Sequence, residues 1–141
     1  MCFKPGIDVL AVFSLLFFSS CTSGPQPIKI GTDSCSYCKM TISDNRFGAE
    51  LITRKGRTYK FDDIHCLVSF NKSGLSNKES IQTIYFVNFE LPHNFIEASK
   101  AYLLKSDEFH TPMAGNIAAF EKEEAAGKFK GTSLNPNVLL K

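Results

Sequence analysis

The sequence lacks tryptophan, has little net charge, and contains no apolar run of the length that a transmembrane helix needs. Its 16 Lys and Arg residues nearly balance 14 Asp and Glu residues, which leaves a formal charge of +2. No basic run is interleaved with aromatic residues, so nothing favours a nucleic-acid partner. The missing tryptophan excludes nothing, because 13 Phe and 4 Tyr can supply a packed core. A length of 141 residues predicts one compact domain or two very small ones rather than a multidomain enzyme.

Residues 1–20 differ in composition from the rest of the chain and resemble a secretory signal. Lys4 is the only early basic residue, residues 9–18 form an apolar run, and small residues precede Cys21. The run is shorter than the roughly 20 apolar residues of a membrane-spanning helix. Small residues followed by a cysteine resemble the bacterial lipobox, in which the cysteine becomes the lipidated N-terminus. We therefore expect a signal peptide over residues 1–20, with an uncleaved anchor as the alternative.

Lipidation at Cys21, with palmitate among its acyl chains, would hold the protein to the lipid bilayer. Several chains are needed, because a single acyl chain anchors a protein only marginally. Residues 21–30, which include Gly24, Pro25 and Pro27, are then the lipid anchor and tether. Thr22 stands where lipoproteins retained at the inner membrane carry Asp. We therefore expect an anchor in the outer membrane, with the domain facing the periplasm.

Residues 31–91 predict a ββαβ order. Two strands over 48–53 and 57–61 are linked by Lys55-Gly56 as a hairpin. Asp62 or Asp63 can cap a helix, which a turn-rich segment over 71–77 would end. Alternating apolar residues over 81–89 then predict a central strand.

Residues 92–141 repeat this order more weakly and form a second, smaller half. Residues 98–105 and 113–119 are candidate strands, 120–126 is prone to form a helix, and 132–140 would supply a closing strand or a tail. Each half alone would bury little apolar surface. The predicted fold class is therefore α+β, with two small ββαβ-like halves packed together.

The cysteines and methionines carry the most specific chemical signal. Apart from Cys2 in the signal and Cys21, three cysteines remain: Cys35, Cys38 and Cys66. An odd number in an exported protein leaves at least one thiol unpaired, which indicates reactivity or metal binding. If the chain over 38–40 is extended, the sulfurs of Cys38 and Met40 share one face. Both are soft donors that select Cu(I) over harder divalent ions.

Each of these residues also has a simpler interpretation. Cys35 and Cys38 could form a structural disulfide or a redox pair, and zinc fits less well because no second Cys/His pair has regular spacing. Met40 could be a core residue. Met113 lies between Pro112 and Gly115, which suit a tight turn that presents a side chain, so we interpret it as a ligand rather than as packing.

The histidines and the remaining cysteine were weighed in the same way. His110, three residues before Met113, could complete the site through its imidazole. His65 and Cys66 follow the predicted helix start and could lie near a metal, although Cys66 is equally suited to a small buried core position. The Asp62-Asp63 pair is more typical of a helix cap than of a ligand pair, and carboxylates are poor donors for Cu(I).

Three segments, in this order, resemble the NosL family: Cys35-x-x-Cys38-x-Met40-x-Ile42, Lys60-Phe61-Asp62-Asp63-Ile64-His65-Cys66 and Pro112-Met113. The resemblance implies a lipid-anchored protein that binds Cu(I) and passes it on for assembly of the copper centres of nitrous oxide reductase. It also implies a fold similar to that of organomercurial lyase. The implied partners are the apo-reductase and its membrane ABC-type maturation complex.

Carried over by position, the family's copper ligands are Cys38, Met40 and Met113, with Cys35 and His110 as further candidates. The family usually has Gly where this chain has Lys39, a Met-Gly pair where it has Met113-Ala114, and a Pro near Ala119. We therefore predict a Cu(I) metallochaperone and not an enzyme. The alternatives are a thiol–disulfide protein using Cys35 and Cys38, an organomercurial-type lyase using Cys38, Cys66 and Asp63, and a structural lipoprotein.

Overall fold

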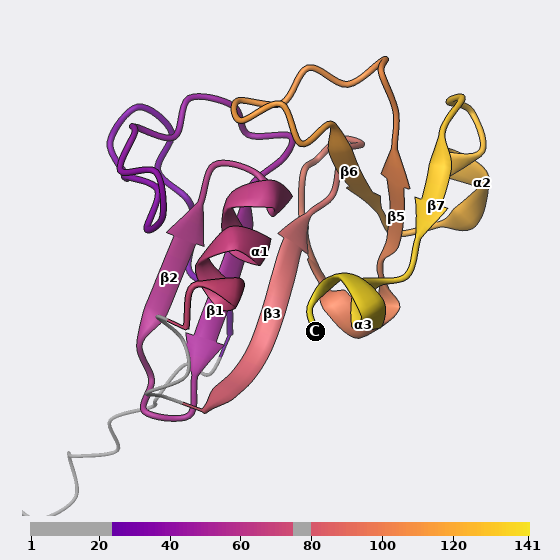
Figure 1. Ribbon diagram of the computed structural model, residues 1–141. Helices are drawn as coiled ribbons and strands as arrows, with labels where there is room; N and C mark the ends of the chain where they lie inside the picture. Colours follow the sequence, from indigo (N-terminus) through magenta and orange to yellow (C-terminus); the bar gives the residue numbers. More distant parts are fainter. Residues whose placement is uncertain (1–23, 75–79) are drawn as a thin grey trace, which may run out of the picture.

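The computed structural model describes residues 24–74 and 80–141 (Figure 1). The predicted signal peptide and Cys21 lie outside this part of the chain. Its elements, in order, are β1 (Ala49–Thr53), β2 (Thr58–Phe61), α1 (Ile64–Lys72), β3 (Ile81–Val87), β4 (Phe95–Glu97), η2 (Ala98–Lys100), β5 (Tyr102–Lys105), β6 (Ile117–Phe120), α2 (Glu123–Ala126), β7 (Thr132–Leu134) and α3 (Pro136–Leu139).

The first sheet has the strand order β2-β1-β3-β4, and every neighbouring pair is antiparallel. β1 and β2 form the expected hairpin, whose turn places Gly56 at φ +82°, a conformation that glycine adopts without strain. β3 lies between β1 and β4, as a central strand should. The predicted ββαβ order is therefore present, and β4 adds a strand that the sequence pattern did not predict.

The second sheet has the order β6-β5-β7, also antiparallel. The predicted strand over 98–105 is wrong in its first part, because residues 98–100 form the 3₁₀ helix η2. The strand expected over 113–119 begins only at Ile117, since Ala114 and Asn116 have φ values of +56° and +53° that a strand cannot contain.

The ends of the chain's last elements also differ from the sequence prediction. The helix expected over 120–126 is shorter, because Phe120 belongs to β6 and the helix starts at Glu123. The segment 132–140 divides into β7 and α3. The division falls at Pro136, whose missing N–H suits the first turn of a helix.

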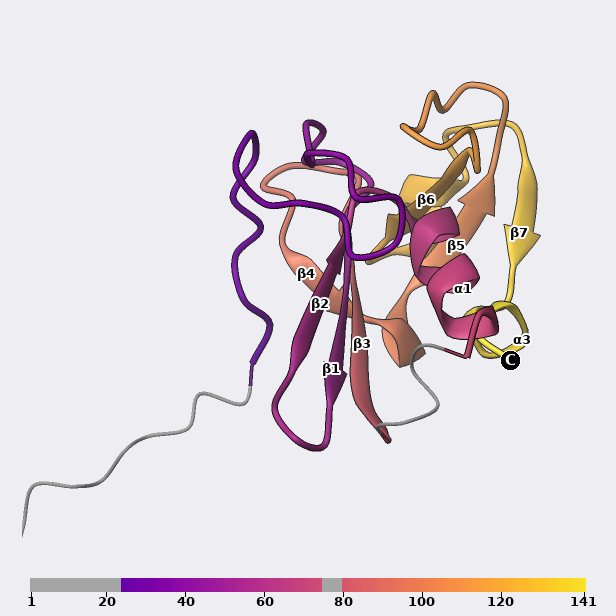
Figure 2. The ribbon, with the colours of Figure 1, turned by 60° about the vertical axis from the view of Figure 1, so that its left-hand side comes forward.

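α1 lies between the two sheets (Figure 2). Its buried side chains pack in one apolar cluster with residues of both sheets, among them Leu51 and Phe86 of the first and Leu103 and Ile117 of the second. The chain just after β3 also contacts β6, because the N–H of Phe89 donates to the carbonyl of Ala119 at 2.8 Å. The two sheets therefore share α1 and the apolar cluster around it.

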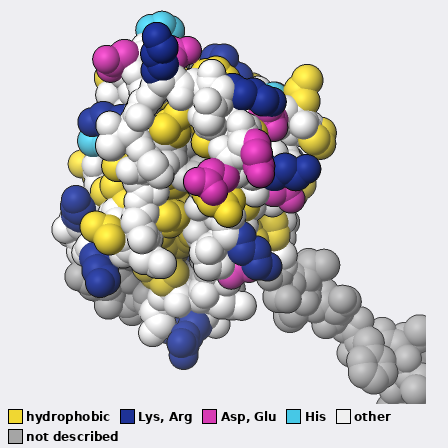
Figure 3. Space-filling model, turned by 90° about the vertical axis from the view of Figure 1, so that its right-hand side faces the viewer, with side chains coloured by type: hydrophobic (Ala, Val, Ile, Leu, Met, Phe, Trp, Pro, Cys, Tyr) yellow, Lys and Arg dark blue, Asp and Glu magenta, His cyan; other side chains and the backbone are white. Residues whose placement is uncertain are grey.

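Strand β6 is buried on both faces. Ile117 and Ala119 point into the cluster around α1, whereas Ala118 and Phe120 point into a second cluster rich in phenylalanine. This alternation follows from the two-residue period of a strand. On the face of the molecule in Figure 3, basic and acidic side chains are interspersed with small apolar patches.

The fold class is mixed α and β, with two small antiparallel sheets and few helices. Within residues 24–74 and 80–141, no helix has the length and apolar character required to cross a membrane.

Gly131 allows β7 to approach β5, which gives a first prediction. A Cβ at this position would overlap the backbone oxygen of Lys105. We expect Gly131→Ala to lower the free energy of unfolding by about 1–3 kcal/mol in urea denaturation. The matched control is Gly127→Ala, where φ is −64° and the nearest atoms lie 3.6 Å from the added Cβ. Equal effects of the two substitutions would contradict this packing.

Candidate metal site

A loop over residues 34–41 carries Cys35 and Cys38. Its ends pair as an antiparallel bridge between Ser34 and Thr41, and the N–H of Cys35 donates to the carbonyl of Met40 at 2.8 Å. Ser36 attaches the loop to β2, because its N–H donates to the carbonyl of Lys60 at 2.7 Å. The loop is therefore held against the end of the first sheet.

Asp62 and Cys66 lie at the start of α1, close to this loop. Asp63 is the N-cap residue, and its Oδ1 accepts from the N–H of Cys66 at 2.9 Å. This confirms that the Asp62-Asp63 pair starts the helix, with Asp63 as the cap. Asp62 lies just before the helix and is buried. The cap thus fixes Cys66 in the first turn of α1, close to Asp62.

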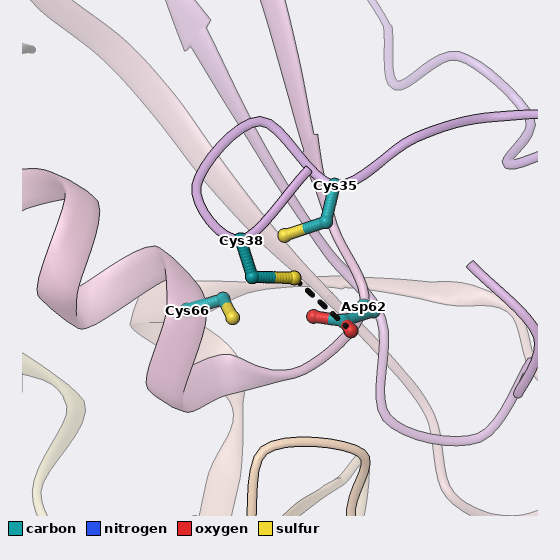
Figure 4. Close-up of side chains that lie close together, drawn as sticks. All are labelled: Cys35, Cys38, Asp62 and Cys66. Atoms are coloured by element: carbon teal, nitrogen blue, oxygen red, sulfur yellow. Dashed lines mark hydrogen bonds between the residues drawn. The ribbon is translucent and has the colours of Figure 1, made fainter. Parts of the chain in front are cut away.

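Cys35, Cys38, Asp62 and Cys66 point toward one another (Figure 4) and form what we call the thiol cluster. The four ligand atoms, three Sγ and one carboxylate oxygen, all lie within 4.8 Å of one another. The Sγ of Cys38 lies 3.6 Å from Oδ2 of Asp62 and donates to it. All three cysteines are free thiols. Only Cys38 is partly exposed, so it marks the open side of the cluster.

The carboxylate of Asp62 has an unsatisfied oxygen in this cluster. Its side chain is 2% exposed, and Oδ1 is buried without a hydrogen-bond partner. Leaving such an atom unpaired costs about 1–3 kcal/mol. A bound cation would satisfy it, and three thiols are the soft donors that suit Cu(I) or zinc. The residues present therefore fit a thiophilic metal ion.

The three thiols differ in proton affinity. A hydrogen bond from the Cys66 side chain is the main cause that lowers the pKa of Cys35 to about 6. The same bond, followed by burial, raises the pKa of Cys66. Burial is also the main cause that raises the pKa of Cys38. One negative charge can therefore sit on Cys35 near neutral pH while Cys66 keeps its proton.

The structure brings only some of the predicted ligands into the cluster. Cys35 and Cys38 belong to it, whereas Met40 is 58% exposed and His110 is exposed. Met113 is partly buried against the apolar cluster that contains Cys35 and Cys66.

The chain over 38–40 is not extended as supposed. Lys39 has φ +67°, so the alternation of a strand does not apply to Cys38 and Met40. Their placement follows from a turn instead, in which the N–H of Lys39 donates to the carbonyl of Cys35 at 3.0 Å.

Cys66 and Asp62 are the two members of the thiol cluster that the sequence does not predict as ligands. The sequence suits Cys66 equally to a buried core position, and it suits Asp62 to a helix cap. The spacing of Asp62, Asp63 and Cys66 could have predicted that Asp62 and Cys66 lie close together. A helix cap at Asp63 puts Cys66 in the first turn of the helix, near Asp62, which precedes the cap.

Two departures from the family pattern fall at strained backbone positions. Lys39 and Ala114, which stand where the family usually has Gly, have φ values of +67° and +56°. An L-residue pays roughly 1–2 kcal/mol in this region, and glycine does not. The backbone at Lys39 and Ala114 therefore carries strain that glycine would not.

We expect Ala114→Gly to raise the free energy of unfolding by about 1 kcal/mol, because glycine relieves the left-handed strain. Ala101→Gly is the matched control: φ there is −85° and the methyl is buried, so glycine should be destabilising. Denaturant unfolding of both variants checks the pair. A decrease at both positions would contradict the strain at Ala114.

The hydrogen bond between Cys66 and Cys35 predicts how the metal-free protein titrates. The first thiolate should form at about pH 6, well below the value of about 8.5 for free cysteine. Cys66→Ala removes the donor and should shift this step to higher pH. Met40→Ala changes an exposed side chain outside the thiol cluster, so it is the control and should leave the step in place. Ultraviolet thiolate absorbance across a pH series measures the step, and no effect of Cys66→Ala would contradict the assignment.

Comparison with known proteins shows the family to which the chain belongs. The sequence model of the NosL family matches residues 27–133. No curated protein matches the chain. The crystal structure of the copper chaperone NosL from Shewanella denitrificans is similar, with a TM-score of 0.65 and 21% sequence identity over 79% of this chain and 92% of that chain. At this identity the structural similarity shows the fold, and the family match extends through both sheets. The chain therefore belongs to the NosL family.

Proposed function

We propose that this protein binds one Cu(I) ion at the open side of the thiol cluster and passes it to another protein. The observation that carries the proposal is the convergence of three free thiols, of which Cys38 is partly exposed. The family membership and the similar copper chaperone support copper as the ion. The monovalent state is proposed because soft sulfur donors favour it.

The proposed ligands are Cys38 and Met113, with Met40 as a ligand that can join or leave. Cys38 is the partly exposed thiol of the cluster, and Met113 packs against the same apolar residues. Met40 is more than half exposed, so its thioether can reach solvent. Two or three ligands at a surface leave room for the thiolates or imidazoles of a recipient to attack the ion. Cys35 and His110 remain further candidate ligands.

The proposed recipient is apo nitrous oxide reductase, reached together with its membrane ABC-type maturation complex. Family membership and the motifs that resemble those of the family support this proposal. In the same proposal, Cys21 carries the lipid anchor, residues 21–30 are the tether, and the domain faces the periplasm. The proposed role is that of a metallochaperone. The similarity to the organomercurial lyase fold stays an expectation from the sequence resemblance, and it would concern the fold alone.

A thiol–disulfide function is the second candidate, because a lowered pKa at Cys35 favours thiolate chemistry. The two functions require different residues. Exchange needs Cys35 with a neighbouring cysteine and does not need methionine. Copper transfer needs Cys38 and the methionine sulfurs, and it tolerates a change at Cys35 better.

An anaerobic Cu(I) titration against a chromophoric chelator tests the proposal. We expect the wild type to bind one ion, Cys38→Ser to lose most of the affinity, and Met113→Ala and Met40→Ala each to lower it by at least about tenfold. Val138→Ala removes an exposed apolar side chain of α3 and serves as the control. No competition by the wild type would overturn copper binding. If Cys35→Ser abolished the biological function of the protein while Met40→Ala and Met113→Ala left it unchanged, thiol–disulfide exchange would be favoured.

A further inference from the structure

The carboxylate of Asp63 joins two parts of the chain that are 50 residues apart. It is 1% exposed, and each of its oxygens accepts one backbone N–H. Oδ1 accepts from Cys66 in the first turn of α1, and Oδ2 accepts from Met113, both at 2.9 Å. The cap of the helix is therefore also the attachment point of the loop that carries Met113.

This loop is seated on the first turn of α1 by further contacts. The N–H of Ala114 donates to the carbonyl of Thr111 at 3.0 Å, and the N–H of Asn116 donates to the Thr111 hydroxyl at 2.9 Å. Gly115 lies so close to α1 that an added Cβ would be 2.5 Å from the Cβ of His65. The loop is thus compact, and its hydrogen bond to Asp63 holds the backbone of Met113 itself.

We infer that Asp63 is a positioning residue that holds Met113 beside the thiol cluster, so that its sulfur can bind the ion that Cys38 binds. The inference rests on the proposed function, in which Met113 is a copper ligand. Asp63 does not touch the ion. It acts through the backbone of Met113, as groups outside the ligand set commonly orient metal ligands.

Substitutions at Asp63 can remove its hydrogen bond to Met113 and keep its hydrogen bond to Cys66. Asp63→Ser keeps an N-cap oxygen for Cys66, since serine caps helices about as well as aspartate, but its side chain is too short to bond Met113 as well. Asp63→Asn has the shape of the native side chain, but an NH2 group replaces one of its two oxygens and cannot accept the N–H that this oxygen binds. The second variant is available should the first fold poorly.

The test is a double-mutant cycle on Cu(I) affinity, measured by chelator competition on the full chain. We expect Asp63→Ser to lower the affinity by about tenfold to a hundredfold. In a Met113→Ala background, the same substitution should change it by less than about threefold, because the residue it positions is gone. In the metal-free protein, amide hydrogen exchange of Met113 should become faster in Asp63→Ser.

Each contrary outcome has one meaning. Full affinity in both Asp63 variants, with a wild type that binds Cu(I), overturns the positioning role and leaves the proposed function intact. The positioning role is also overturned if Asp63→Ser lowers the Cu(I) affinity equally in the wild type and in the Met113→Ala background, because Asp63 would then act through the helix alone. An unchanged rate of amide hydrogen exchange at Met113 in Asp63→Ser would exclude the hydrogen bond to Asp63 as the contact that holds Met113 in place. A wild type that does not bind Cu(I) overturns the proposed function, and the positioning role with it.

Discussion

The arrangement of the whole molecule depends on how α1 begins. The carboxylate of Asp63 is buried at the helix N-terminus, where the exposed backbone N–H groups and the helix dipole favour a negative charge. Because one of its oxygens caps the helix and the other accepts from Met113, a single side chain sets the relation of the helix to the second half of the chain. Cys66 and Asp62 flank this residue, so the start of the helix also assembles the thiol cluster.

Neither sheet could bury enough apolar surface alone. The first has four strands and the second has three short ones. They share α1 as a common layer, and β6 packs its two faces into the two apolar clusters. Small side chains at Ala118 and Ala119 let the clusters approach each other closely. The thiol cluster itself is built from the first half of the chain, and the Met113 segment of the second half is attached beside it through Asp63.

Local sequence signals predicted the first half well and the site only in part. The hairpin at Gly56 and the cap at Asp63 depend on residues adjacent in sequence, so their patterns were sufficient. β4 is three residues long and is defined by pairing with β3, which no local period reveals. The approach of Cys66 to Cys35 and the seat of the Met113 loop are tertiary contacts. The positive φ of Lys39 and Ala114 runs against the preference of their residue types.

The central claim is that sulfur atoms from the loop over 34–41 and from the Met113 segment bind the same ion. The most direct measurement is the anomalous diffraction of copper in crystals of the Cu(I)-loaded protein. The account predicts one copper peak at the open side of the thiol cluster, bonded to the sulfurs of Cys38 and Met113. A peak elsewhere, or a copper bound by cysteines while the Met113 sulfur faces the apolar core, would contradict it.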